Sequence, residues 1–64
     1  MNLKQYFDKS VKIVADNDLI FEGVVCDYFS PEDNDNVQES IVVEIGNKDF
    51  IEFYPSVIKS ITLT

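Results

Sequence analysis

The sequence predicts a mostly β fold: a small barrel, closed or nearly closed, of five antiparallel strands with a short N-terminal helix. The longest apolar run, residues 19–30, is rich in β-branched and aromatic side chains and is apolar in both alternation phases. Such a run is typical of a strand that must be covered on both faces. Gly23 lies inside it and can bend one strand so that it serves both walls of a barrel. With 64 residues, the chain is expected to form one domain, residues 1–64.

The N-terminal segment predicts a short helix over residues 3–8. Asn2 is a capping residue type, Gln5 stands in the capping-box position, and three apolar residues then share one helical face: Leu3, Tyr6 and Phe7. A helix this short is stable only when it docks on other elements. We expect it to close one open end of the barrel; the alternative is a helix that binds a partner.

Alternation and turn residues predict strands at 11–15, 19–30, 40–45, 49–54 and 58–63. In the first strand, Val11, Ile13 and Ala15 are expected to face inward. Residues 16–18, Asp-Asn-Asp, form a turn because these residue types tolerate the left-handed conformation. Gly46 and Asn47 predict a two-residue hairpin turn of type I′ or II′. Pro55 ends the fourth strand and opens a 3₁₀ turn.

The charge balance narrows the possible partners. Twelve acidic residues stand against five lysines, giving a net charge of −7, and arginine and histidine are absent. This balance disfavours binding to nucleic acid and to anionic membranes, and suits a basic partner. The N-terminus has no signal-peptide pattern and no run is long enough to span a membrane, so a cytoplasmic protein is expected.

No pattern of catalytic or cofactor-binding residues is present, so the sequence predicts neither an enzyme, nor a cofactor, nor a small-molecule substrate. Cys26 is the only thiol; without histidine to activate it, it is expected to be a small buried filler. The acidic segment 30–40 predicts an exposed loop. Asp33, Asp35 and Glu44 imitate the ends of a calcium loop, but Val37 and Gln38 occupy the positions that need an oxygen ligand and the turn glycine. A cation-responsive loop is therefore only an alternative to a solvated one.

The layout resembles the Sm-like family, in which a short helix precedes five bent strands of an SH3-like barrel. The strand at 11–15 and the apolar-x-Gly-x-apolar run at 21–25 carry the resemblance, and Asp27 and Tyr28 loosely match an element at that strand's end. The resemblance implies a ring in which the fourth and fifth strands of neighbours pair, here 50–54 and 58–63. It also implies RNA-contacting loops, one of which holds Asn34 and Asn36. The other normally carries Arg-Gly or Lys-Gly, whereas this chain has residues 54–57, Tyr-Pro-Ser-Val.

The aromatic residues of the fourth strand are the strongest binding candidates. Phe50 and Tyr54 share a face with Glu52, next to Tyr28. On an outer sheet face they would contact protein, or stack on single-stranded nucleic acid; alternatively, the N-terminal helix covers them. We therefore expect a non-catalytic binding or assembly module that self-associates as a ring or dimer or docks on a protein. The alternative is an Sm-like RNA-binding protein, which the charge disfavours. Gly23, Gly46 and Pro55 are expected to be structural.

Overall fold

The five predicted strands are present in the computed structural model, which describes residues 2–35 and 37–64. The elements in chain order are η1 (Leu3–Tyr6), β1 (Ser10–Ala15), β2 (Ile20–Phe29), β3 (Ser40–Gly46), β4 (Asp49–Phe53), η2 (Pro55–Val57) and β5 (Ile58–Leu63). All neighbouring strands are antiparallel, and they form one sheet in the order β4-β3-β2-β1-β5. The prediction of a mostly β fold with five antiparallel strands is confirmed.

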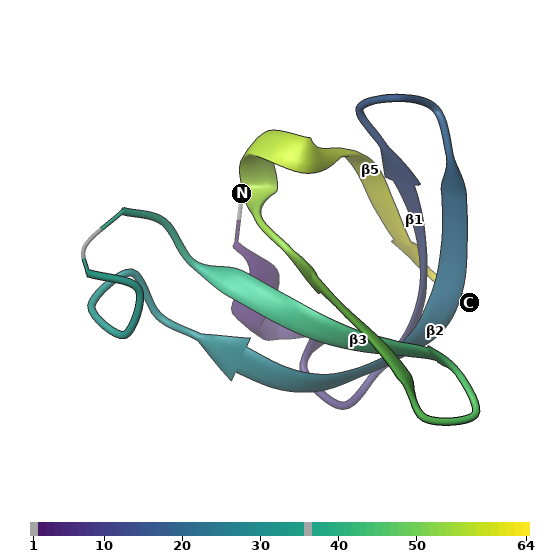
Figure 1. The fold of residues 1–64 in the computed structure, drawn as a ribbon, viewed down its shortest axis with the longest axis horizontal. Coiled ribbons are helices and arrows are strands. Elements are labelled where there is room, and N and C mark those ends of the chain that lie inside the picture. The colour runs from purple at the N-terminus through teal and green to yellow at the C-terminus, as the bar shows by residue number, and fades with distance from the viewer. Residues whose placement is uncertain (1, 36) are drawn as a thin grey trace.

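The prediction of a closed barrel is wrong. The sheet curls strongly, as Figure 1 shows, but its two end strands, β4 and β5, do not pair with each other in the part of the chain that is described. The 3₁₀ turn η2 connects them, and they diverge from it, so no ladder forms between them. The molecule is therefore a curled open sheet with two free edges.

The N-terminal helix is shorter and tighter than predicted. Its cap is as expected: the Asn2 Oδ1 atom accepts from the Lys4 amide at 3.3 Å, and the Gln5 side chain donates to the Asn2 carbonyl at 2.9 Å. The segment is a single 3₁₀ turn that ends at Tyr6, because Phe7 already has an extended ψ of 132°. Leu3 is fully buried and anchors η1 in the core, whereas Phe7 is 49% exposed.

The core lies on the concave side of the curled sheet. Its cluster of buried side chains takes members from η1 and from every strand: Leu3, Val11, Ile13, Val25, Ile41, Val43, Phe53 and Ile58. Ala15, the third predicted inward residue of β1, is buried as well. The Phe21 and Phe53 rings meet edge to face, with centroids 5.4 Å apart. Burial of this apolar surface is the main stabilising contribution in so small a domain.

β2 is not covered on both faces, contrary to the prediction. Ile20 and Val24 remain 58% and 42% exposed. A β-bulge between Val25 and Asp27 shifts the alternation instead, so that Val25 and later Tyr28 both reach the core side. Cys26 is the extra residue of this bulge. It is exposed, not a buried filler, and its Sγ donates to the Val42 carbonyl at 3.4 Å.

Gly23 is required by a close approach of two strands. A Cβ atom here would lie 2.8 Å from the carbonyl carbon of Glu44, closer still to its oxygen, and 2.9 Å from a Val43 methyl. Any side chain at this position would push β2 away from β3. The structural role predicted for Gly23 thus has a definite cause, although the β-bulge itself lies further along the strand.

The turns agree with prediction in two places and differ in one. Asp18 has a φ of 68°, as expected for the 16–18 turn, and Pro55 opens η2. Gly46, however, does not supply the left-handed residue of the β3–β4 turn; Lys48 does, with a φ of 70°. The turn residues are Asn47 and Lys48, so the predicted hairpin turn is shifted by one residue.

Candidate functional site

The two free edges of the sheet are the most extended candidate for recognition. β4 pairs only with β3 and β5 only with β1 in the described residues. The Thr64 amide donates to the Ser10 carbonyl at 3.0 Å, next to the registered pair Val11–Leu63. Because hydrogen-bonded and non-hydrogen-bonded pairs alternate along an antiparallel ladder, the backbone N–H and C=O of Leu63 point away from β1. β5 therefore offers unused backbone groups to a further strand.

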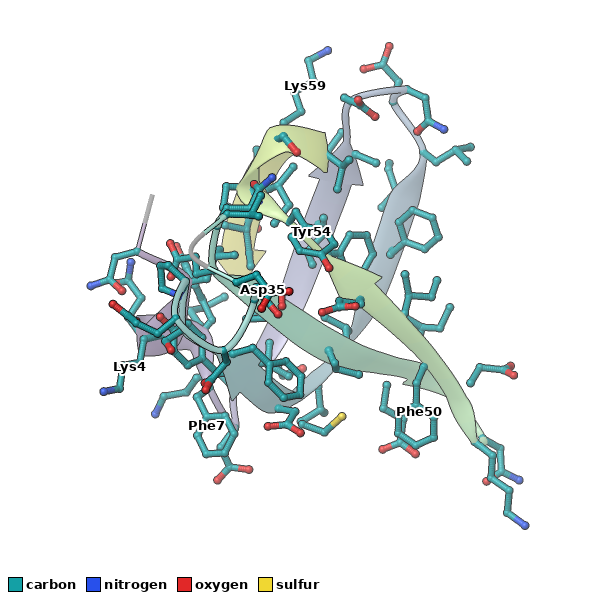
Figure 2. The ribbon with its side chains drawn as sticks, turned by 60° about the vertical axis from the view of Figure 1, so that its left-hand side comes forward. Lys4, Phe7, Asp35, Phe50, Tyr54 and Lys59 are labelled. Carbon is teal, nitrogen blue, oxygen red and sulfur yellow. The ribbon has the colours of Figure 1, made fainter. Side chains whose placement is uncertain are left out.

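Phe50 adds an apolar side chain to the β4 edge. It lies opposite Glu44, which in turn lies opposite Val24, so the three residues form a row across the convex face of the sheet. Phe50 is 57% exposed and projects from the β4 end near the β3–β4 turn (Figure 2). Of the two alternatives for Phe50, an outer position or cover by the N-terminal helix, the structure has the outer position: η1 packs on β2 and β3, and Phe50 remains exposed.

Tyr54 does not form one surface with Phe50. It follows the last residue of β4, at the opposite end of that strand, and lines a hollow of about 340 Å³ (Figure 2). The other lining residues come from the acidic loop: Asp33, Asn34, Asp35, Val37 and Gln38. The loop is attached beside this hollow by Gln38, whose side chain accepts from the Ser56 amide at 3.3 Å.

Asn34 fastens the acidic loop and does not project freely. Its side-chain amide donates to the Gln38 carbonyl and to the Ser40 hydroxyl, each at 2.9 Å. The buried Ser40 hydroxyl then donates to Glu52 on β4 at 2.7 Å. These bonds use both amide hydrogens of Asn34, so the side chain positions the loop. Asn36, the other predicted binding residue of the loop, lies outside the described residues.

Tyr28 borders a second depression, between η1 and β2, with a volume of about 300 Å³ and lined by Lys4, Phe7, Asp27 and Tyr28. The Tyr28 hydroxyl donates to Glu39, whose same oxygen accepts from the Leu3 amide, both at 3.1 Å. Partial burial raises the pKa of Tyr28, as do the hydrogen bond to Glu39 and the negative charges of Glu39, Glu32 and Asp33.

The acidic side chains are dispersed. Asp33 accepts from the amide and the hydroxyl of Ser30, at 3.2 and 3.1 Å, and Asp18 pairs with Lys59 at 2.6 Å on an exposed surface. In the described ranges, no three acidic or cysteine side chains come together as a metal-binding group. The same ranges contain no helix with the length and apolarity needed to cross a membrane.

Comparisons with protein families, with curated proteins and with solved structures find no match to this chain. The candidate recognition features of the molecule are its two free strand edges, the exposed Phe50, and the two depressions lined by Tyr54 and Tyr28.

Sequence reasoning overlooked two exposed apolar residues. Phe7 was expected to dock with Leu3 and Tyr6, but the 3₁₀ turn ends before it and leaves it outside. Leu63 is 62% exposed although it ends the last strand, at the free edge. For Phe7, the residue pattern itself held a signal: a segment of so few residues makes only one turn and can bury only part of its apolar set.

Proposed function

We propose that this protein is a non-catalytic assembly module that self-associates through its sheet edges, β4 of one copy pairing with β5 of the next. The observation that carries the proposal is that the first and last strands of one sheet both have a free edge. An exposed edge is a ready template for a further strand. Because the two edges differ, the contact is head-to-tail, and such contacts form rings when the rotation closes.

Exposed apolar side chains on the two end strands support the proposal. Phe50 on β4 and Leu63 on β5 are 57% and 62% exposed. Burying them against a neighbour adds apolar contact to a domain whose own core is small. In proteins that stay monomeric, charged residues or proline usually protect edge strands against pairing with another chain. β5 carries one lysine, Lys59, near its start, and no proline.

The resemblance to Sm-like proteins supports the same assembly, since the fourth and fifth strands of neighbours pair in that family. A second function, RNA binding in the Sm manner, has less support. The loop that would contact RNA carries Asp33 and Asp35, and the described residues that line the hollow beside it include no basic one. Binding of a uridine-rich oligonucleotide at low salt would favour this second function; phosphate contacts make such binding strongly salt-dependent.

Size-exclusion chromatography with light scattering tests the assembly. The full chain is expected to show a mass above that of the 7.3 kDa monomer at micromolar concentration. Leu63→Pro removes the outward amide of β5 without touching the ladder to β1, and is expected to shift the protein to monomer. Leu63→Ser, which keeps the amide, is the matched control and should retain most of the assembly. A clean wild-type monomer would refute the proposal.

A further inference from the structure

The depression between η1 and β2 combines exposed rings with charge. Its lining residues are Lys4, Phe7, Asp27 and Tyr28. Phe7 is 49% exposed and projects from the end of η1 (Figure 2), and Tyr28 is half-buried. Apolar rings that border an open depression of about 300 Å³ are suited to an apolar side chain from another molecule. We call these four residues and the space between them the η1–β2 groove.

Negative charge dominates the surroundings of the groove. Asp27 lines it, and Glu39 accepts a hydrogen bond from the Tyr28 hydroxyl at 3.1 Å. Partial burial, followed by the hydrogen bond to Glu39 and the charges of Glu39, Glu32 and Asp33, raises the pKa of Tyr28. Among the residues that the structure describes, Lys4 is the one cation in the lining. The ion pair found among the described residues joins Lys59 to Asp18, so Asp27 has no cation paired with it.

We propose that the η1–β2 groove binds a basic segment of a partner protein. An apolar side chain of that segment sits against Phe7 and Tyr28. Lysine or arginine side chains on either side of it meet Asp27 and the carboxylates that surround Tyr28. Charge complementarity of this kind raises the association rate and selects the partner, while the apolar anchor supplies most of the affinity.

The charge argues against the other possible occupants. A second copy of this chain has a net charge of −7 and would bring more negative charge to an already acidic surface. Nucleic acid and anionic lipid meet the same repulsion. The groove is also separate from the proposed assembly edges, because η1 and β2 form it while β4 and β5 form the edges. The proposal of partner docking and the proposal of self-association can therefore be tested independently of each other.

The test uses the full ¹⁵N-labelled chain and a synthetic peptide with one central leucine flanked by two lysines on each side. Binding is followed by chemical-shift changes and by fluorescence anisotropy of the labelled peptide. Two control peptides separate the contributions: one replaces the leucine by serine, and the other replaces the lysines by glutamates. The shifts are expected at residues 4–7 and 27–28, and affinity is expected to fall as salt rises.

Two variants with matched controls locate the site. Phe7→Ser removes the exposed ring and is expected to weaken peptide binding by about tenfold. Ile20→Ser, at a similarly exposed apolar position at the opposite end of β2 from Asp27 and Tyr28, should leave binding unchanged. Asp27→Asn removes the charge but keeps the Oδ1 acceptor that the Tyr28 amide uses at 2.9 Å, and should weaken binding severalfold; Glu22→Gln is its control.

Several results would overturn the inference. The first is a failure of the leucine–lysine peptide to bind at low salt, and the second is equal binding of the serine or glutamate peptide. The third is an unchanged affinity of the Phe7→Ser variant for the peptide, and the fourth is chemical-shift changes centred on Tyr54 and the acidic loop. Binding of a uridine-rich oligonucleotide at residues 4–7 and 27–28 in place of the peptide would assign the groove to nucleic acid and overturn it as well. None of these measurements depends on the oligomeric state, which light scattering reports separately.

Discussion

The two hairpins that share β3 are held together in different ways. In the β2–β3 hairpin, Gly23 lies against the backbone of Glu44, and Ser40 is fully buried at the far end. In the β3–β4 hairpin, Gly46 is exposed, and Lys48 holds a left-handed φ of 70°. The first hairpin is fixed by close packing, and the second by a two-residue turn that includes an unfavourable conformation.

The two glycines show what this difference teaches. Gly23 has almost no space for a Cβ, because β3 passes too close. At Gly46 the nearest atom to a Cβ would be Asp49 Oδ2 at 3.4 Å, an ordinary contact, and its φ is not positive. A glycine in a sequence therefore does not say whether it is needed; the neighbouring strand decides.

Gly23→Ala should have the largest effect. The added methyl overlaps the Glu44 carbonyl, so the strands must separate, and the free energy of unfolding should fall by about 3 kcal/mol. In a domain this small, that loss is a large part of the total stability. Urea unfolding followed by circular dichroism measures it, with Gly46→Ala as the matched control. Equal losses for both variants would remove the contrast between the hairpins.

Ser40→Ala tests the other end of the first hairpin. The substitution deletes the hydroxyl that accepts from Asn34 and donates to Glu52. Loss of a buried hydrogen bond to a charged group should cost about 1.5 kcal/mol. Ser60→Ala, at an exposed position of β5, is the control and should change stability by less than about 0.5 kcal/mol. The same urea measurement decides; a negligible change for Ser40→Ala would mean that the acidic loop is held by other contacts.

Lys48→Gly should change stability in the opposite direction. Glycine adopts a φ of 70° without the steric penalty of a side chain, so the β3–β4 hairpin should gain about 0.5–1 kcal/mol. Asn47→Gly is the control, because Asn47 has no positive φ and gains nothing from glycine. The gain appears as a higher midpoint with an unchanged denaturant slope. A loss of stability in Lys48→Gly would place the left-handed residue elsewhere in the turn.

The smallest expected effect concerns Tyr28, near the end of β2 that leads into the acidic loop. The pKa of Tyr28 is raised, so the folded state favours the protonated phenol. That stabilising contribution is present below the unfolded pKa of about 10 and is lost as the pH rises through the raised value. The free energy of unfolding should therefore fall more steeply above pH 10 in the wild type than in Tyr28→Phe. Identical pH slopes in the two proteins would contradict the shift.

Much of the fold could be predicted because the signals for it are local. Alternation in residues 11–15 gave the inward face of β1, and Pro55 marked η2 within one residue of the end of β4. The same local rules failed at the bulge after Val25, where an extra residue moves Tyr28 to the core side and Cys26 outward. A bulge depends on how β2 pairs with β3, and alternation within one strand does not contain that information.

The candidate site was predictable only in part. Alternation placed Phe50 on one face of the fourth strand but left open whether that face is exposed, and the resemblance drew attention to the fourth and fifth strands. Tyr54 lines a separate hollow, and Asn34 holds the acidic loop in place by hydrogen bonds. Both roles depend on how the acidic loop folds back on Ser40 and Ser56. Phe7 joins Tyr28 only because η1 packs beside β2.

The sequence by itself determined the number of strands and their order along the chain, two of the three predicted turns and the net negative charge, because alternation, turn chemistry and charge are properties of neighbouring residues. Only the tertiary structure decided that the sheet stays open between β4 and β5, that β3 leaves no space for a Cβ atom at Gly23, and that the η1–β2 groove exists. Each of these depends on the distance between segments far apart in the chain, which is set when the whole core packs at once.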